Sequence, residues 1–100
     1  MSTVAVALPS HLRALAGIEG EVTVDAPDEP TIRDVLDGLE AAYPVLRGTI
    51  RDHGTLQRRA FMRYFASQQD LSHQSPETPL PAEVVDGRES FRVVTAIAGG

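Results

Sequence analysis

The sequence contains no cysteine, no lysine and no tryptophan. Without cysteine the chain has no disulfide, no thiolate metal ligand and no internal persulfide, so packing alone must hold the fold. All nine basic residues are arginine. Because an isopeptide bond needs a lysine amine, we expect the chain to be a poor acceptor for conjugation.

Positive charge and long apolar runs are also scarce. Nine basic and fourteen acidic residues give a formal net charge of −5, which argues against a surface that neutralises nucleic-acid phosphates. No apolar run approaches the length of a membrane-spanning helix, and no charged segment followed by an apolar one marks the N-terminus. We therefore expect a cytoplasmic protein with neither a nucleic-acid nor a membrane partner.

The length of the chain suits one domain. One hundred residues, of which 42% are hydrophobic, supply one modest core and leave no room for a second. We expect a single domain over residues 1–100, ending in a flexible tail at residues 96–100, where every residue except one isoleucine is alanine or glycine.

Two segments near the N-terminus alternate with the period of half-buried strands. They cover residues 3–8 and 21–25, and Gly17 and Gly20 between them favour a reversal of the chain. We expect an N-terminal hairpin with a rather long connection. The residues expected to face the core are Val4, Val6, Leu8, Val22 and Val24.

The clearest helix signal begins at Thr31. Thr31 is a good N-cap residue, and Asp34 follows three residues later in a near capping-box arrangement. Pro44 cannot continue the helix, which should end at Tyr43 or just before. The apolar stripe comprises Ile32, Val35, Leu36, Leu39 and Tyr43, and the opposite, exposed face is expected to carry Arg33, Asp37 and Glu40.

The second half of the chain predicts two more strands. Residues 45–58 suit a short helical turn and a loop, and residues 60–66 are rich in aromatics and predict a central strand with Phe61 and Phe65 in the core. Residues 67–83 form a polar, proline-containing loop anchored by Leu71 and Leu80. The Asp-Gly turn at 86–87 then precedes a strand at residues 90–95, with Phe91 and Val93 inward.

This order predicts an α+β roll. One main helix should pack across a mixed sheet of four to five strands, with the first and last strands side by side.

The chain resembles the MoaD/ThiS family of ubiquitin-like sulfur carriers over nearly its whole length. The matching segments are VAVALPSHLR at residues 4–13, TIRDVLDGLEAAYP at 31–44, the segment 61–71, the turn at 86–87 and the ending Ala-Ile-Ala-Gly-Gly. The ending is most similar to that of the actinobacterial carriers that supply sulfur for cysteine synthesis. Two features depart from the family: Thr95 stands where proline is frequent, and Ser67-Gln68-Gln69 replaces the usual Asn-Gly or Asn-Asp turn.

The resemblance implies a β-grasp fold and a function. The free carboxylate of Gly100 would be adenylated by an activating enzyme that uses ATP, and then converted to a thiocarboxylate. The thiocarboxylate would donate sulfur to a synthase making cysteine, molybdopterin, thiamin or a specialised metabolite. Ile97, Ala98 and Gly99 would form the rest of the recognised tail, and a metalloprotease could trim the tail or release it. The chain itself would be a cosubstrate with no bound cofactor, and not an enzyme.

A partner surface can also be suggested. Phe61, Met62, Tyr64 and Phe65 cannot all face one side of a strand, so some apolar surface should be exposed beside the tail. We take Arg59, Tyr64 and Phe65 as the candidate surface for the activating enzyme. The arginines at positions 58, 59 and 63 would suit an acidic groove on a partner, although a solvated strand edge explains them equally well.

The sequence leaves three questions open. A protein modifier joined through Gly100 to lysines of other proteins would share the same tail, and a binding module would not need the tail at all. The sulfur acceptor and the oligomeric state are not determined. The three histidines, His11, His53 and His73, are scattered without ligand spacing, so no metal site is assigned.

Overall fold

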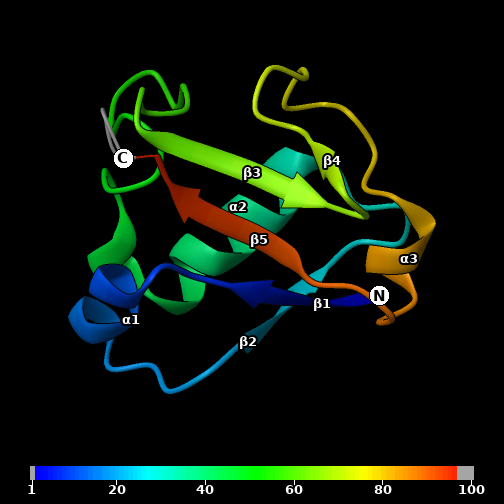
Figure 1. The fold of residues 1–100 in the computed structure, drawn as a ribbon, viewed down its shortest axis with the longest axis horizontal. Coiled ribbons are helices and arrows are strands. Elements are labelled where there is room, and N and C mark those ends of the chain that lie inside the picture. Colours follow the sequence, from blue (N-terminus) through cyan, green and yellow to red (C-terminus); the bar gives the residue numbers. More distant parts are fainter. Residues whose placement is uncertain (1, 97–100) are drawn as a thin grey trace.

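The computed structural model describes residues 2–96, which form a five-stranded mixed sheet with one long helix across it (Figure 1). The spatial order of the strands is β2-β1-β5-β3-β4. The strands are β1 (Ser2–Ala7), β2 (Val22–Ala26), β3 (Met62–Ala66), β4 (Gln69–Asp70) and β5 (Phe91–Thr95). The helices are α1 (Ser10–Ala16), α2 (Ile32–Ala42), the 3₁₀ turn η1 (Pro44–Leu46) and α3 (Ala82–Val85).

The pairing of the strands confirms the predicted hairpin and the predicted neighbourhood of the first and last strands. β1 pairs antiparallel with β2, and Val4 lies opposite Val24. β5 runs parallel to β1, with Phe91 opposite Val6, and antiparallel to β3. The middle strand of the sheet is β5, and β3, predicted as a central strand, is also an interior strand because β5 and the two-residue strand β4 flank it.

The connection between β1 and β2 holds a helix that the sequence pattern did not indicate. α1 spans only seven residues, and Leu12 is its one fully buried residue, so it carries too little periodicity to be recognised. Gly17 ends it in the left-handed region at φ 70°, as glycine does at many helix ends. The predicted reversal at the glycines is correct, since Gly20 also has a positive φ of 73°.

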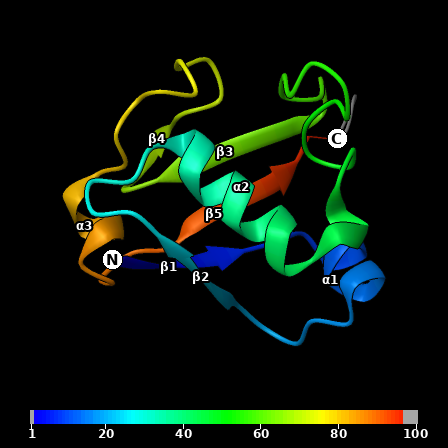
Figure 2. The same ribbon diagram turned by 180° about the vertical axis from the view of Figure 1, so that it is seen from behind.

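α2 has the predicted boundaries because its ends are locally encoded. The Thr31 N–H donates to Asp34 Oδ2 at 2.9 Å and the Asp34 N–H donates to Thr31 Oγ1 at 3.2 Å, which completes a capping box. The helix covers one face of the sheet (Figure 2), and its apolar stripe joins the inward residues of the strands in a single core. The core contains Val4, Val6, Val24, Ile32, Val35, Leu36, Leu39, Met62, Tyr64, Phe91 and Val93 among others.

One residue of α2 contradicts the expected exposed face. Glu40 is 8% exposed and accepts from Arg51, itself 4% exposed, through Nε at 3.0 Å and Nη2 at 2.9 Å. Arg51 Nη2 also donates to Asp37 Oδ1 at 2.9 Å. Burial alone would lower the pKa of Arg51, but the hydrogen bonds and charges of the two carboxylates raise it overall. This cluster ties the segment after η1 to α2.

The polar segment 67–83 is anchored as predicted. Leu71 and Leu80 are 5% and 6% exposed. The segment also bonds to the start of α2, because the Ile32 N–H donates to the Thr78 carbonyl at 3.1 Å and the Leu80 N–H donates to the Pro30 carbonyl at 2.9 Å. None of the helices within residues 2–96 is long and apolar enough to cross a membrane.

Candidate functional site

The carboxyl end of β5 is hydrogen-bonded to the neighbouring strand region up to Ala96. Thr95 lies opposite Met62 in the antiparallel pair of β3 and β5. One residue further, the Ala96 N–H donates to the Phe61 carbonyl at 2.7 Å. Ala96, which was expected to begin the tail, is therefore still bonded to the sheet. The predicted tail residues Ile97, Ala98, Gly99 and Gly100 lie outside the described residues.

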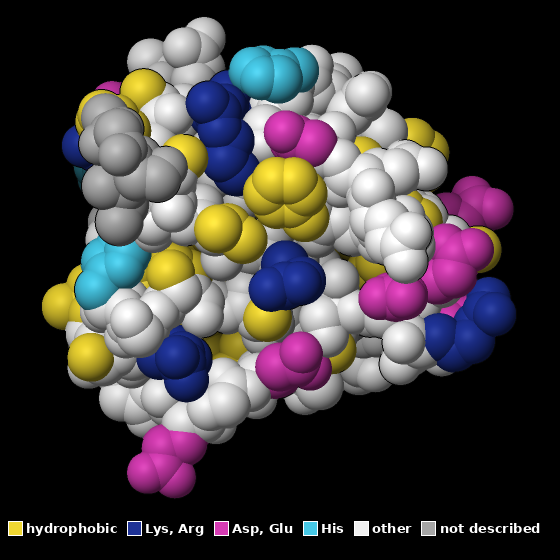
Figure 3. Space-filling model, in the orientation of Figure 1, with side chains coloured by type: hydrophobic (Ala, Val, Ile, Leu, Met, Phe, Trp, Pro, Cys, Tyr) yellow, Lys and Arg dark blue, Asp and Glu magenta, His cyan; other side chains and the backbone are white. Residues whose placement is uncertain are grey.

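The face of the sheet opposite α2 presents arginine and apolar side chains beside one another. Arg63 lies opposite Val94, and Phe65 lies opposite Arg92, on the outward side of β3 and β5. Directly paired residues on one face have Cβ atoms about 4.5–5.5 Å apart, so these four side chains form a contiguous patch. We call them the open-face patch. Figure 3 shows hydrophobic and arginine side chains adjoining over these two strands.

Neither arginine of the open-face patch forms an ion pair with a residue in the range 2–96. Among residues 2–96, the ion pairs of the other arginines are those of Arg33, Arg51 and Arg88, and neither Arg63 nor Arg92 belongs to one. The pKa of Asp70 is lowered mainly by hydrogen bonds from Ser72 and only to a smaller extent by the charge of Arg63. A positively charged patch with an aromatic side chain therefore stands on a chain whose net charge is −5.

A shallow groove adjoins the end of β5. It has a volume of about 580 Å³ and is lined by Arg59 and Phe61 together with residues of the loop before β3, including Asp52. Phe61 is 59% exposed. Asp52 stabilises the loop because its Oδ1 accepts from the Thr55 and Gly54 N–H groups at 2.9 Å each, and these bonds lower its pKa.

Solved structures with the same architecture exist. SAMP1 from Haloferax volcanii is 18% identical and superposes with a TM-score of 0.74, covering 98% of this chain and 99% of that chain. A chain of the Amycolatopsis orientalis BexX/CysO complex is 19% identical, with a TM-score of 0.71 and coverages of 97% and 99%. Mycobacterium tuberculosis CysO, described as an antigen, is 21% identical, with a TM-score of 0.70 and coverages of 94% and 99%.

The chain has the ubiquitin-like β-grasp fold. The agreement extends over nearly the full length of each neighbour and confirms the fold that the sequence resemblance implied. No family model matches the sequence, and no curated protein sequence matches it. At these low identities the likeness establishes the fold of the β-grasp domain and not its activity.

The predicted partner surface needs one correction. Phe65 lies on the open face and Arg59 is exposed beside the groove, but Tyr64 is 4% exposed and packs against Phe91 with ring centroids 5.5 Å apart. The phase of β3 places Met62, Tyr64 and Ala66 inward. Phe61, expected in the core, precedes the strand and is exposed. Since apolar residues occupy both faces of this strand, its sequence did not reveal which face was buried.

Arg92 and Val94 were missed as members of the patch, although a signal for them existed. Phe91 and Val93 were correctly expected to face the core, and strand alternation then places the residues between and after them outward.

Arg58, grouped in the sequence with Arg59 and Arg63, has a different role. It donates to the backbone carbonyls of Ser72 at 2.8 Å and Met62 at 2.8 Å and so joins two segments of the fold.

No metal-binding group is seen in the part of the chain that the structure describes. No three residues of histidine, cysteine, aspartate or glutamate gather there as ligands would. The three histidines are exposed and far apart in the sequence. The candidate site therefore consists of the open-face patch, the groove and the end of β5.

Proposed function

We propose that this β-grasp domain is a sulfur carrier whose working group is the carboxylate of Gly100. One observation carries the proposal: the chain leaves a strand in the middle of the sheet and continues with no polar linker into Ala-Ile-Ala-Gly-Gly. The fold is that of SAMP1 and CysO, and the sequence ending resembles that of the MoaD/ThiS carriers.

The geometry at the end of β5 supports the reach that such a carrier needs. Ala96 is hydrogen-bonded to Phe61, so residues 97–100 alone separate the sheet from the proposed working group. Four residues span at most about 14 Å when extended. Glycine at the last two positions removes both side chains and suits passage through a narrow enzyme channel.

The proposed chemistry belongs to the partner enzymes. At neutral pH the terminal carboxyl, with a reference pKa of roughly 3.3–3.7, is ionised and is a nucleophile. Its oxygen attacks the α-phosphate of ATP on the activating enzyme and pyrophosphate leaves. Sulfide then attacks the acyl carbon and AMP leaves, which produces the thiocarboxylate directly with no change of oxidation state. The β-grasp domain supplies position and the enzyme supplies catalysis.

We place the docking of the activating enzyme on the open-face patch. Arginine and aromatic residues are enriched in protein interfaces, and the patch lies on the strands that lead to the tail. Its charge suits an acidic surface on the partner. A sulfur-accepting synthase would use the same tail after the transfer.

Mass spectrometry of the intact protein tests the proposal. The chain is incubated with an activating enzyme, ATP and a sulfur source, and we expect the mass gain of one oxygen-to-sulfur exchange located at Gly100. A variant that lacks Gly99 and Gly100 is the matched control and should gain nothing. An unchanged mass in the full chain, with an enzyme that loads another carrier, would refute the proposal.

A protein modifier is the second candidate function, because solved neighbours of this fold are named small archaeal modifier proteins. The first activation step would be the same, and the acceptor would be a lysine of another protein. Arg92 is the last tryptic cleavage site before Gly100, so a conjugated lysine would retain residues 93–100 after digestion. Such adducts in a cell digest favour the modifier, whereas a metabolite that gains sulfur favours the carrier.

A further inference from the structure

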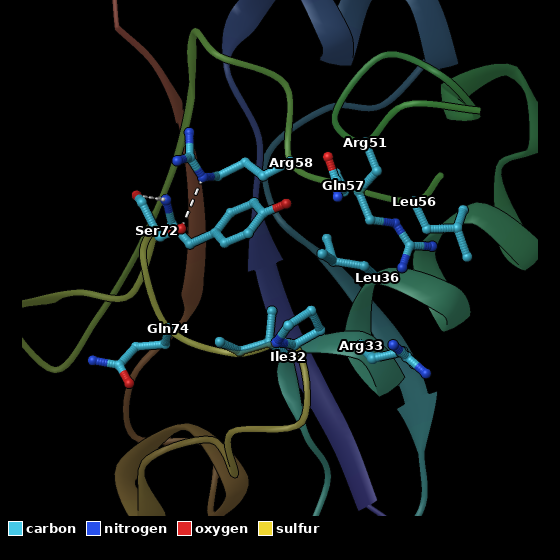
Figure 4. A pocket seen from close by; sticks show the side chains of 11 residues that line it. Ile32, Arg33, Leu36, Arg51, Leu56, Gln57, Arg58, Ser72 and Gln74 are labelled. Carbon is cyan, nitrogen blue, oxygen red and sulfur yellow. Dashed lines mark hydrogen bonds between the residues drawn. The ribbon is translucent and has the colours of Figure 1, made fainter. Parts of the chain in front are cut away.

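A cavity of about 280 Å³ lies on the side of the sheet that α2 covers, away from the open-face patch (Figure 4). It is enclosed by the first half of α2, the loop 51–58, β3 and the segment 72–76. In Figure 4, Gln57 and Arg58 extend from the loop on one side, and Ile32 and Leu36 extend from α2 on the other. The apolar part of the lining is Ile32, Leu36, Leu56 and Pro76.

Tyr64 lines this cavity, and its hydroxyl has no hydrogen-bond partner in the part of the chain that the structure describes. Tyr64 is 4% exposed, and its backbone amide bonds to Ser72 Oγ, but no hydrogen bond joins its hydroxyl to any residue in the described range 2–96. Burial raises the pKa of Tyr64 to about 12, against the opposing charges of Arg51 and Arg58. The hydroxyl therefore keeps its proton at neutral pH and can donate it to a ligand.

The charged groups of the lining are all arginines. Arg33 and Arg51 form ion pairs with carboxylates that do not line the cavity. Arg58 differs from them, because its side chain donates only to backbone carbonyls and no carboxylate of residues 2–96 forms an ion pair with it. A hydroxyl donor without a hydrogen-bond partner in residues 2–96 and a guanidinium without a carboxylate partner there, beside an apolar wall, favour a ligand that accepts hydrogen bonds and bears negative charge.

We propose that this cavity binds a small carboxylate with a compact apolar body, such as a monocyclic aromatic acid. Its volume is near the lower end of small-molecule sites, which matches a single ring. The ring would pack against Ile32, Leu36 and Leu56, and the carboxylate would face the Tyr64 hydroxyl and Arg58. The site lies on the other side of the sheet from the open-face patch, and its lining includes none of the patch residues, so it does not depend on the proposed sulfur transfer.

Benzoate is a suitable probe, and its neutral isostere benzamide is the matched comparison. Titration of the full-length protein by amide NMR should give benzoate-dependent shifts at Ile32, Arg58, Tyr64 and Ser72. For so small a probe we expect a roughly millimolar Kd. Benzamide should bind at least roughly tenfold more weakly, because a charged acceptor makes a stronger hydrogen bond than a neutral one.

Two variants probe the polar groups separately. Tyr64→Phe keeps the ring and should weaken benzoate roughly 10- to 100-fold, while its melting temperature should not fall, since the hydroxyl has no partner to lose. Gln57→Glu adds a negative charge to the lining and should weaken benzoate at least roughly tenfold. Gln57 is exposed and the structure uses only its backbone groups in hydrogen bonds, so this variant should fold normally.

Gln69→Glu, on β4 outside the cavity, makes the same charge change and should bind benzoate like the wild type. Shifts confined to other parts of the surface would overturn the proposal. So would equal binding of benzoate and benzamide, or unchanged affinity in Gln57→Glu. None of these outcomes bears on loading of Gly100, which is measured separately by mass.

Discussion

Replacement of Arg51 by methionine should strongly destabilise the fold. Arg51 is 4% exposed and is the partner of Glu40, which is 8% exposed. Methionine keeps much of the volume of the side chain but leaves the Glu40 carboxylate buried without its ion pair. The segment that Arg51 anchors leads to Phe61, whose carbonyl accepts from the Ala96 N–H just after β5, so the change also bears on the end of that strand.

The size of the effect follows from burial. Removing one member of a buried ion pair costs about 3–5 kcal/mol because the other charge remains desolvated. For a domain of this length each kcal/mol lowers the melting temperature by roughly 4–8 °C, so the loss should be at least about 12 °C. The second contact of Arg51, to Asp37, contributes little because that side chain is 54% exposed.

A double-mutant cycle provides the assay. The free energy of unfolding is measured by urea denaturation for Arg51→Met, Glu40→Leu and the double variant. Each single change should cost several kcal/mol, whereas the double variant should lie within about 1 kcal/mol of the wild type or above it, since apolar residues replace buried pairs well. A cost below about 1 kcal/mol for Arg51→Met, or additive costs in the double variant, would refute the reasoning.

Three further predictions follow from the structure. Arg92→Glu should slow association with an activating enzyme and reduce its dependence on salt, measured by stopped-flow kinetics, because the open-face patch loses a charge. Gly38→Ala should destabilise the fold by about 1–3 kcal/mol in urea denaturation, although alanine normally favours a helix, because a Cβ there would lie 2.8 Å from the Asp25 carbonyl oxygen. Asp70→Asn should reduce the fall of the melting temperature between pH 7 and pH 2, measured by thermal unfolding.

The sign of the acid effect follows from the lowered pKa of Asp70. Hydrogen bonds from Ser72 hold that pKa below the ordinary value of 3.8, so the folded state binds the proton less well than the unfolded chain. The contribution is fully present above the unfolded value and is lost as the pH falls through the folded one. An unchanged acid profile in Asp70→Asn would contradict this reasoning.

Matched controls exist for the other two predictions. Arg47 lies near Glu40 and away from the open face. Arg47→Glu makes the same charge change as Arg92→Glu and should leave association with the activating enzyme nearly unchanged. Equal slowing by both would show a general charge effect. Ala41→Gly, on the exposed side of α2, should cost about 1 kcal/mol by propensity alone. If Gly38→Ala proved stabilising, the close approach of α2 to β2 would be wrong.

The features that the sequence predicted correctly depend on neighbouring residues. Alternation in the first and last strands identified Val4, Val6, Phe91 and Val93 as core residues, and the capping pair of Thr31 and Asp34 marked the start of α2. These signals need only a few adjacent positions, because strand period, capping and the proline stop act within one turn or one strand.

Other features required contacts between distant parts of the chain. The phase of β3, and with it the burial of Tyr64 and exposure of Phe61, is decided by pairing with β5 and packing under α2. Glu40 became buried because Arg51, eleven positions away, returns to it. The cavity beside Tyr64 combines four separate segments.

The sequence by itself therefore determined the order of elements, the inward faces of the patterned strands and the side-chain-free ending at Gly99 and Gly100. Only the tertiary structure decided which residues of β3 lie beside Arg92, which charges are buried and which hydroxyl has no hydrogen-bond partner within residues 2–96. The physical reason is range: periodicity and capping are local, whereas burial and charge pairing depend on which distant segments meet.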